Sequence, residues 1–294
     1  MSVVPEARPA SAVAVNVLGV VEHPAFGDSP YRVDADGAPY VPVGDGGLVL
    51  GVRLGDPVLG GAGDHVAPGA CLVHPDGAPR QALTLYSCIG NPAQVRSGAA
   101  AGAVGAVVGK RGESGRVIVG FGDDELSAMR PGDQVSVRSF GQGARPSWLP
   151  AEITAMNIEP RVLDLLPISA GSSVEVGVRS VLPARLAGNG LGRPAVSWDL
   201  DLQVTGAAAA PLLLGDLVAI ADIDARWNMG YRSDWMTVGV VVHGASPLPG
   251  HGPGLTVILT GPVSALRPQE DAAGHTGLTA PMLNQRLPDG RDAS

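Results

Sequence analysis

The chain has little charge, few aromatic side chains and almost no cysteine. Of its 294 residues, 16% are charged and 4% are aromatic, and the two cysteines are Cys71 and Cys88. Two thiols in a chain of this length are too few for the disulfide framework of a small secreted domain. No N-terminal segment joins basic residues to an apolar run as a signal peptide does, and no apolar run approaches the ~18 residues of a membrane span. We therefore expect a cytoplasmic protein with no membrane partner.

Basic residues are also scarce, which excludes further classes of function. The net charge is -8, and Lys110 is the one lysine among 20 basic side chains. Nucleic-acid binders usually show basic clusters, and single-strand binders show aromatic platforms, so we expect no nucleic-acid partner. The glycine fingerprint of dinucleotide-binding folds is missing, which argues against a nicotinamide or flavin cofactor.

Glycine, proline and short apolar runs dominate what is present. The chain holds 42 glycines and 26 prolines and is 45% apolar. Short runs rich in branched residues, separated by Gly, Pro, Asp and Asn, are typical of barrels and sandwiches. They read AVNVLGVV, GLVLGVRL, QALTLYSCI, GAVGAVVG, GRVIVGF and DQVSVRSF, then PAVSWDLDLQV, DLVAIADID, TVGVVVH and LTVILTG. The sequence predicts a mainly β (β-rich α+β) fold of two small barrel- or sandwich-like domains, with few helices, near 123–130 and 159–167.

Composition along the chain predicts four segments. Residues 1–12 read as a flexible tail, 13–157 as an N-terminal β-rich domain and 158–266 as a C-terminal β-rich domain. From 267 to 294 the apolar pattern fades, and we expect a second flexible tail there.

A stiff loop near the end of the chain carries two histidines. His243 and His251 lie in HGASPLPGHGPG, where three prolines restrict the backbone and four glycines allow close approach. Upstream, Asp222 and Asp224 are two residues apart and would face the same side of a strand. Asp and His ligands suit zinc, manganese or iron. The sequence thus indicates a divalent-metal site of Asp222, Asp224, His243 and His251, with the histidines also candidate catalytic residues. The alternative is a rigid hairpin with solvated carboxylates.

Other residues are weaker candidates. Asp199 and Asp201 in WDLDL share the two-residue spacing and could support the metal ligands or be unrelated to them. His65, beside Asp64, could serve in catalysis, although neighbours on a strand face opposite ways. Cys88 could act as a nucleophile at a strand-to-turn junction, or be a buried apolar thiol. Lys110, in a glycine-rich hairpin, could hold an anionic cofactor group, but a solvated lysine in an ordinary β-turn is favoured. No zinc signature or phosphate-binding loop is present.

Eight short motifs, taken in order, resemble one family. They are SPYRVDADGAP (29–39), DHVAPG (64–69), SCIGN (87–91), GAVVGKRG (105–112), FGQG (140–143), MNIEP (156–160), GVVVHG (239–244) and GHGPG (250–254). Together, from about Val13 to Leu266, they are similar to the bacterial and archaeal family named domain of unknown function 4438. The resemblance implies a two-part β-rich fold and no particular activity.

Three functions follow as hypotheses. The first is a hydrolase- or lyase-type enzyme acting on a small polar molecule with an Asp/His site around GHGPG, assisted by a metal. The second is a cysteine-nucleophile enzyme using Cys88. The third is a non-catalytic ligand-binding or assembly protein. In each we expect a small-molecule ligand and a homo-oligomer, and motifs concentrated in loops favour the first.

Overall fold

Strands make up most of the regular structure. The computed structural model describes residues 13–24, 29–58, 63–112, 115–204, 212–271 and 277–284. Strands account for 41% of the structure and helices for 11%, which confirms the mainly β prediction. In this described part, no helix has the length and apolar character needed to cross a membrane. Residues 1–12, predicted to be a tail, lie outside it.

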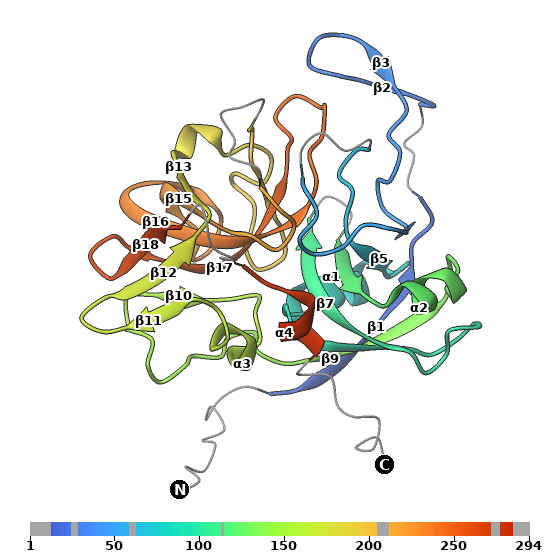
Figure 1. Cartoon of the computed structure of the whole chain (residues 1–294), viewed down its shortest axis with the longest axis horizontal. Coiled ribbons are helices and arrows are strands. Elements are labelled where there is room, and N and C mark those ends of the chain that lie inside the picture. Colours follow the sequence, from blue (N-terminus) through green and yellow to red (C-terminus); the bar gives the residue numbers. More distant parts are fainter. Residues whose placement is uncertain are drawn as a thin grey trace, which may run out of the picture.

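The first half of the chain closes into a six-stranded barrel (Figure 1). Its strands follow the order β1 (Val15–Val21), β9 (Gln134–Ser139), β6 (Pro92–Val95), β7 (Val104–Arg111), β8 (Arg116–Gly120) and β5 (Gly69–Val73). The barrel closes because β1 pairs with β9 on one side and with β5 on the other. Strand β4 (Leu48–Val49) extends from β5. The predicted hairpin around Lys110 is the antiparallel pair β7–β8.

Helices cover parts of this barrel, and one of them corrects a strand prediction. Helix α1 (Gly77–Tyr86) occupies most of QALTLYSCI, and α2 spans Asp123–Ala128. Within α1, Leu83 and Thr84 are buried, and Leu83 lies close enough to β1 that a Cβ on Gly19 would be 3.0 Å from it. Burial of this one face outweighs the β-type composition of the run.

The second half is built around a six-stranded sheet. The path is β10 (Thr154–Ala155), β17 (Gly254–Pro262), β16 (Gly230–His243), β15 (Leu217–Asp224) and β13 (Ser180–Leu182), and β14 (Leu200–Asp201) also pairs with β17. Helix α3 (Pro160–Leu163) and the 3-10 helix η1 (Ala184–Leu186) connect its parts. A smaller sheet contains β11 (Ile168–Ala170), β12 (Val174–Val178) and β18 (Leu266–Glu270).

Part of the predicted C-terminal tail is ordered. Strand β18 pairs in parallel with β12 over five residues, up to Val178 opposite Glu270, and α4 (Ala280–Asn284) buries Leu283. The polar sequence after Arg267 suits an edge strand with few buried side chains, so the fading apolar pattern did not mark the end of the fold.

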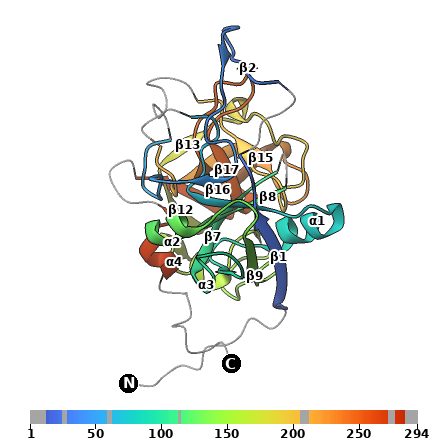
Figure 2. The same cartoon turned by 90° about the vertical axis from the view of Figure 1, so that its right-hand side faces the viewer.

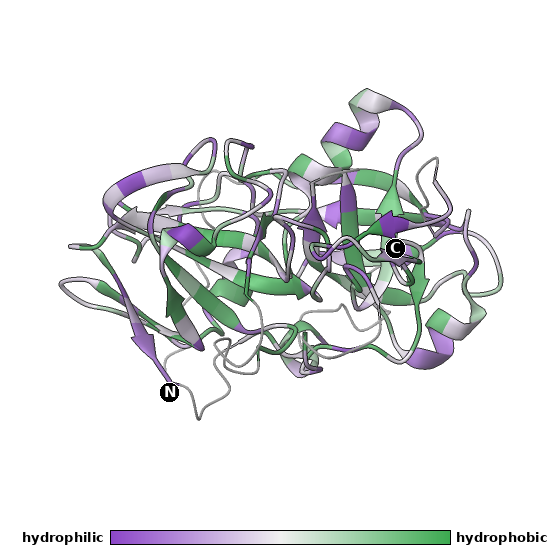
Figure 3. Cartoon of the chain, turned by 90° about the horizontal axis from the view of Figure 1, so that it is seen from above, coloured by the Kyte–Doolittle hydropathy of each residue, from purple (hydrophilic) through white to green (hydrophobic). Residues whose placement is uncertain are grey.

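The two halves share an apolar core. One buried cluster joins Ala106 and Val108 of β7 to Val240 and Val242 of β16. The approach is close: a Cβ on Gly109 would lie 2.3 Å from Val242. Viewed from above, apolar residues run along the strands of both halves, and polar residues gather in loops and on helices (Figure 3). The two halves are therefore closely packed where β7 meets β16.

A small hairpin projects from this body. It consists of β2 (Arg32–Val33) and β3 (Pro39–Tyr40) and rises above the rest of the molecule in two perpendicular views (Figures 1 and 2). Arg32 and Tyr40 are register partners, and both contact the site described next.

Candidate functional site

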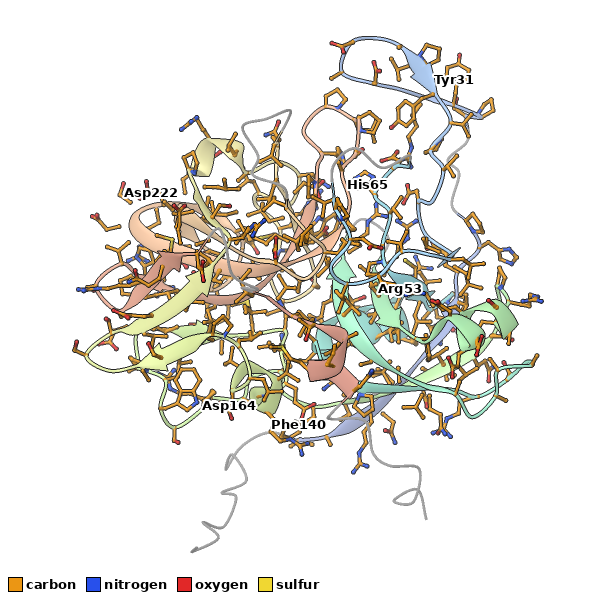
Figure 4. The ribbon with its side chains drawn as sticks, viewed as in Figure 1. Tyr31, Arg53, His65, Phe140, Asp164 and Asp222 are labelled. Atoms are coloured by element: carbon orange, nitrogen blue, oxygen red, sulfur yellow. The ribbon has the colours of Figure 1, made fainter. Side chains whose placement is uncertain are left out.

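A cluster of histidines and aspartates lies where the two halves meet. Strand register assembles its second-half members, because Asp201 of β14 and His243 of β16 both lie opposite Gly254 of β17. His251 lies in the loop that joins β16 to β17. In Figure 4, His65 lies between the barrel half and the second half. The sequence-predicted residues His65, His243 and His251 thus come together.

Backbone hydrogen bonds hold the barrel loop that carries His65 against the loop after β16. The His65 N–H donates to Ala245 O at 3.0 Å, and the Gly244 N–H donates to Val66 O at 2.8 Å. These two bonds fix the histidines of both loops relative to one another. The stiff proline-containing loop therefore serves as a platform for a segment nearly 180 residues earlier in the chain.

Two imidazole nitrogens and a carboxylate oxygen converge in this cluster. His65 Nε2 lies 3.0 Å from His251 Nδ1, which lies 3.0 Å from Asp201 Oδ2, and His65 Nε2 is 3.9 Å from that oxygen. For these separations a point exists about 2.0 Å from all three atoms, which is the length of a zinc–nitrogen or zinc–oxygen bond. These three residues could therefore hold a metal ion.

His243 and Asp199 form a second, adjoining group. His243 Nε2 lies 2.8 Å from Asp199 Oδ2 and 3.5 Å from Asp201 Oδ1. The other ring nitrogen, Nδ1, is 2.9 Å from the Gly244 carbonyl oxygen. Since a carbonyl only accepts, Nδ1 carries a proton, and Nε2 faces the carboxylates. Asp199, Asp201 and His243 are a further set that could hold a metal ion.

Gly254 and Gly112 create the room for this second group. A Cβ on Gly254 would lie 1.9 Å from His243 Nε2 and 2.6 Å from Asp199 Oδ2. The Gly112 N–H donates to Asp199 Oδ1 at 2.9 Å, which turns the other oxygen of that carboxylate toward His243. The last glycine of GHGPG is thus required by a side chain that lies over it.

Asp64 orients His65 from behind. His65 has a φ of 53°, so the expected opposite facing of these neighbours does not apply, and Asp64 Oδ1 lies 2.6 Å from His65 Nδ1. The two atoms are close but misaligned, and both are buried without an aligned hydrogen-bond partner. Arg32 and Tyr40 bind the other oxygen of Asp64, at 3.0 Å and 2.9 Å. A carboxylate behind a histidine is the usual support of a metal ligand.

An arginine-rich group flanks the cluster on the barrel side. Asp45 lies 2.6 Å from Arg111, 3.3 Å from Arg116 and 2.9 Å from Arg32. Asp45, Asp64 and His65 also meet the spacing of a metal site, but these guanidinium groups already neutralise Asp45. By contrast, the ion-pair partners of Asp199 and Asp201 in the described part of the chain are histidines.

Buried partners shift several pKa values. Burial alone would raise the pKa of Asp201, but hydrogen bonds from His243, His251 and His65 hold it well below its usual range. Burial would lower the pKa of His243, but the bonds to Asp199 and Asp201 raise it to about 9. Without a metal, His243 is therefore protonated at neutral pH and paired with these carboxylates.

The predicted ligands Asp222 and Asp224 do not belong to the cluster. Strands β15 and β16 do pair, but antiparallel, with Leu217 opposite Val240 and Asp224 opposite Gly230. The end of β15 nearest His243 is therefore its beginning, and Figure 4 shows Asp222 at the outer edge of the second half.

The contacts of these two carboxylates also differ from a ligand's. Asp224 binds Arg226 at 2.8 Å and Arg232 at 3.0 Å. Asp222 has a φ of 58° at a register shift, which breaks the expected alternation. The carboxylates of the candidate site are Asp199 and Asp201, which share the two-residue spacing and which the sequence offers only as weaker candidates.

Cys88 and Lys110 lie in a separate buried region. Burial raises the pKa of the Cys88 thiol to about 11, and its Sγ lies 3.8 Å from Gln142 Oε1. Lys110 is 1% exposed and donates to Asn157 Oδ1 and Val196 O, both at 2.8 Å. Burial lowers its pKa to about 8. The expected solvated turn lysine is therefore wrong, and its bonds tie β7 to the second half.

Two surface hollows lie elsewhere. One of about 280 Å³ lies beside α2, and one of about 320 Å³ is lined by β7, β8 and α4 residues. Neither is lined by a histidine or a cysteine. The chemistry of its side chains therefore makes the buried cluster the stronger candidate.

Comparison with known proteins places the chain in a family. Family models described as domain of unknown function (DUF4438), N-terminal and C-terminal, match residues 31–164 and 165–276. The chain belongs to the DUF4438 family. This confirms the resemblance of the eight motifs, and the family's function is unknown.

One solved structure is similar over nearly its whole length. It is titled "Crystal structure of TM1086" and is 35% identical, with a TM-score of 0.86, over 90% of this chain and 95% of that one. No curated protein matches the chain. The Asp/His cluster draws residues from both DUF4438 regions, His65 from the first and Asp199, Asp201, His243 and His251 from the second.

Proposed function

We propose that this DUF4438 protein is a metal-dependent enzyme of the hydrolase or lyase type that acts on a small polar molecule. The ion is a divalent zinc, manganese or iron held by His65, His251 and Asp201. The observation that carries the proposal is the convergence of His65 Nε2, His251 Nδ1 and Asp201 Oδ2 at separations of 3.0, 3.0 and 3.9 Å. Two histidines and one carboxylate leave coordination positions for water and substrate.

The burial of Asp201 supports a cation at this point. Asp201 is 2% exposed, and its Oδ2 lies 3.0 Å from His251 Nδ1 without an aligned hydrogen bond. A buried carboxylate is costly unless positive charge or well-aligned donors compensate it. A metal ion bound by Asp201 Oδ2 and the two imidazole nitrogens would supply that charge.

The chain's own groups suit proton transfer and positioning. A bound divalent ion would polarise a substrate carbonyl or lower the pKa of a water molecule. His243, 3.5 Å from Asp201 Oδ1 and bound to Asp199, can hold a proton next to the reacting atoms. The side chain of His251 is 19% exposed, whereas those of His65 and His243 are almost fully buried. A substrate would therefore reach the site past His251, which favours a small one.

The cysteine-nucleophile alternative has less support. Cys88 is fully buried, and its pKa is raised rather than lowered. A nucleophilic cysteine needs an accessible thiolate. A non-catalytic binding role uses the same Asp/His cluster, so turnover separates it from the proposal.

Elemental analysis of the chain, purified without a histidine tag, tests the proposal. We expect at least one zinc, manganese or iron ion per chain in the wild type, and the loss of at least one ion in both His251→Ala and Asp201→Asn. Asp224→Asn is the matched control, because it removes a carboxylate outside the cluster, and it should keep the metal. The loaded protein is then screened with ester, amide and elimination substrates.

The outcomes are distinct. A wild type that takes up none of the three metals, even when they are supplied, refutes the metal site. An unchanged metal content in both His251→Ala and Asp201→Asn refutes the ligand assignment. Metal bound without any turnover indicates the binding role instead.

A further inference from the structure

Asp201 presents its two oxygens to two different sets of donors. Oδ2 faces His251 Nδ1 at 3.0 Å and His65 Nε2 at 3.9 Å. Oδ1 faces His243 Nε2 at 3.5 Å. The residue therefore belongs to two of the triads that could hold a metal ion, and His65 and His243 stack with ring centroids 5.1 Å apart. A carboxylate shared in this way is the usual bridge between paired metal ions.

The second set has three ligand atoms of its own. It contains Asp199 Oδ2, 2.8 Å from His243 Nε2, and Asp201 Oδ1, 3.5 Å from the same nitrogen. Both separations suit ligands of one ion with bonds of ~2.0–2.2 Å. His243 Nδ1–H is bound to the Gly244 carbonyl at 2.9 Å, which directs Nε2 inward, as the outer bonds of metal-binding histidines do.

Gly254 and the charge balance both bear on this second position. The lack of a side chain at Gly254 allows His243 Nε2 and Asp199 Oδ2 to come together, since a Cβ would be 1.9 and 2.6 Å from them. The charge balance also fits an ion. Asp45 and Asp64 are paired with arginines. Among the ion pairs of the described residues, the partners of Asp199 and Asp201 are histidines. Two buried carboxylates and three imidazoles are thus left as ligands for cations.

We propose that the site holds two divalent cations bridged by Asp201. One is bound by His65, His251 and Asp201 Oδ2, and the other by Asp199, His243 and Asp201 Oδ1. This inference rests on the proposed function and sharpens it, and it makes His243 Nε2 a ligand of the second ion in place of a holder of a proton. Paired ions ~3.5–4 Å apart stabilise both the attacking and the leaving oxygen of a displacement, so the pair favours hydrolysis over elimination.

Manganese titration of the metal-stripped full chain tests the pair. Manganese chloride is added to wild type, Asp199→Asn, His251→Ala and Asp224→Asn, and bound manganese is counted after gel filtration. We expect two ions per chain in the wild type and in the control Asp224→Asn. Asp199→Asn and His251→Ala should each bind one, because each removes a ligand of one ion alone. Electron paramagnetic resonance of the loaded wild type should show the spin coupling of two neighbouring ions, which both variants lose.

Each result separates this inference from the proposed function. One ion per wild-type chain, lost in His251→Ala, overturns the pair and leaves the single-metal enzyme standing. Two ions without spin coupling also overturn it, because the second then lies elsewhere. No bound ion overturns both proposals. Far-ultraviolet circular dichroism of each variant shows whether the loss of an ion is a loss of fold. If Asp199→Asn is unfolded, Asp199→Glu replaces it. This variant keeps a carboxylate and is expected to restore the second ion.

Discussion

Replacing Gly254 by alanine should damage the site and the fold together. The backbone there has no positive φ, so alanine adopts it without strain, but the added Cβ would lie 1.9 Å from His243 Nε2 and 2.6 Å from Asp199 Oδ2. Restoring normal contact requires the imidazole to retreat by about 1.5 Å. That movement breaks the 2.8 Å bond between His243 and Asp199.

The structure sets the size of the effect. Breaking a buried ion pair costs ~3–5 kcal/mol, and overpacking a dense interior costs ~1–3 kcal/mol by itself. We expect Gly254→Ala to lower the free energy of unfolding by about 3–5 kcal/mol. With a total stability of ~5–15 kcal/mol for typical domains, the variant should still fold at low temperature, which permits the measurement.

Urea unfolding of the metal-free proteins at pH 7 measures this loss, with Gly239→Ala as the matched control. A Cβ on Gly239 would meet Leu255 at 2.5 Å in the same sheet, away from the Asp/His cluster. The control should lose ~1–3 kcal/mol and keep its metal, whereas Gly254→Ala should lose metal as well. Wild-type stability and metal content in Gly254→Ala would show that His243 does not lie over that glycine.

Three further results are expected. First, wild type should gain stability relative to Lys110→Met by on the order of 3 kcal/mol between about pH 8 and 10.5, measured by urea unfolding. The folded pKa of Lys110 is lowered to about 8, so the unfolded chain binds the extra proton in that window, whereas the raised pKa values of His243, Cys71 and Cys88 lower the stability of both proteins alike. Second, Asp64→Asn should weaken metal binding about 10- to 100-fold, measured by chelator competition, since Asp64 supports His65; unchanged affinity would contradict that role. Third, iodoacetamide should leave Cys71 and Cys88 unmodified in the native protein, because burial raises both pKa values to about 11. Rapid labelling of Cys88, seen by mass spectrometry, would support the cysteine-nucleophile alternative.

Local patterns predicted most of the strands and part of the site. The continuous apolar runs predicted β7, β8, β15, β16 and β17, because a strand buried on both faces needs such a sequence. The stiff loop after His243 indicated a fixed direction for its histidines, and they do lie in the Asp/His cluster. Composition predicted a strand where the structure has helix α1, because the same residues suit either element. There the packing of one face, which buries Leu83, decides the element.

The carboxylates of the site could not be chosen from the sequence. Asp199 and Asp201 have the same spacing as Asp222 and Asp224, and nothing local distinguishes the two pairs. The antiparallel register of β15 and β16 carries Asp224 away from His243. Pairing of β14 with β17 brings Asp201 to Gly254. The spacing marks both pairs as candidates, and only the strand register chooses between them.

By itself, the sequence determined the class of fold, the family, the few helices at 123–130 and 159–167, and the stiffness of the loop that holds His243 and His251. These follow from residue composition and from spacing over a few residues. Only the tertiary structure decided which carboxylates face those histidines, that Asp64 supports His65, and that Lys110 is buried. Such choices depend on strand register and on contacts between segments far apart in the chain, where a one-residue shift changes every partner.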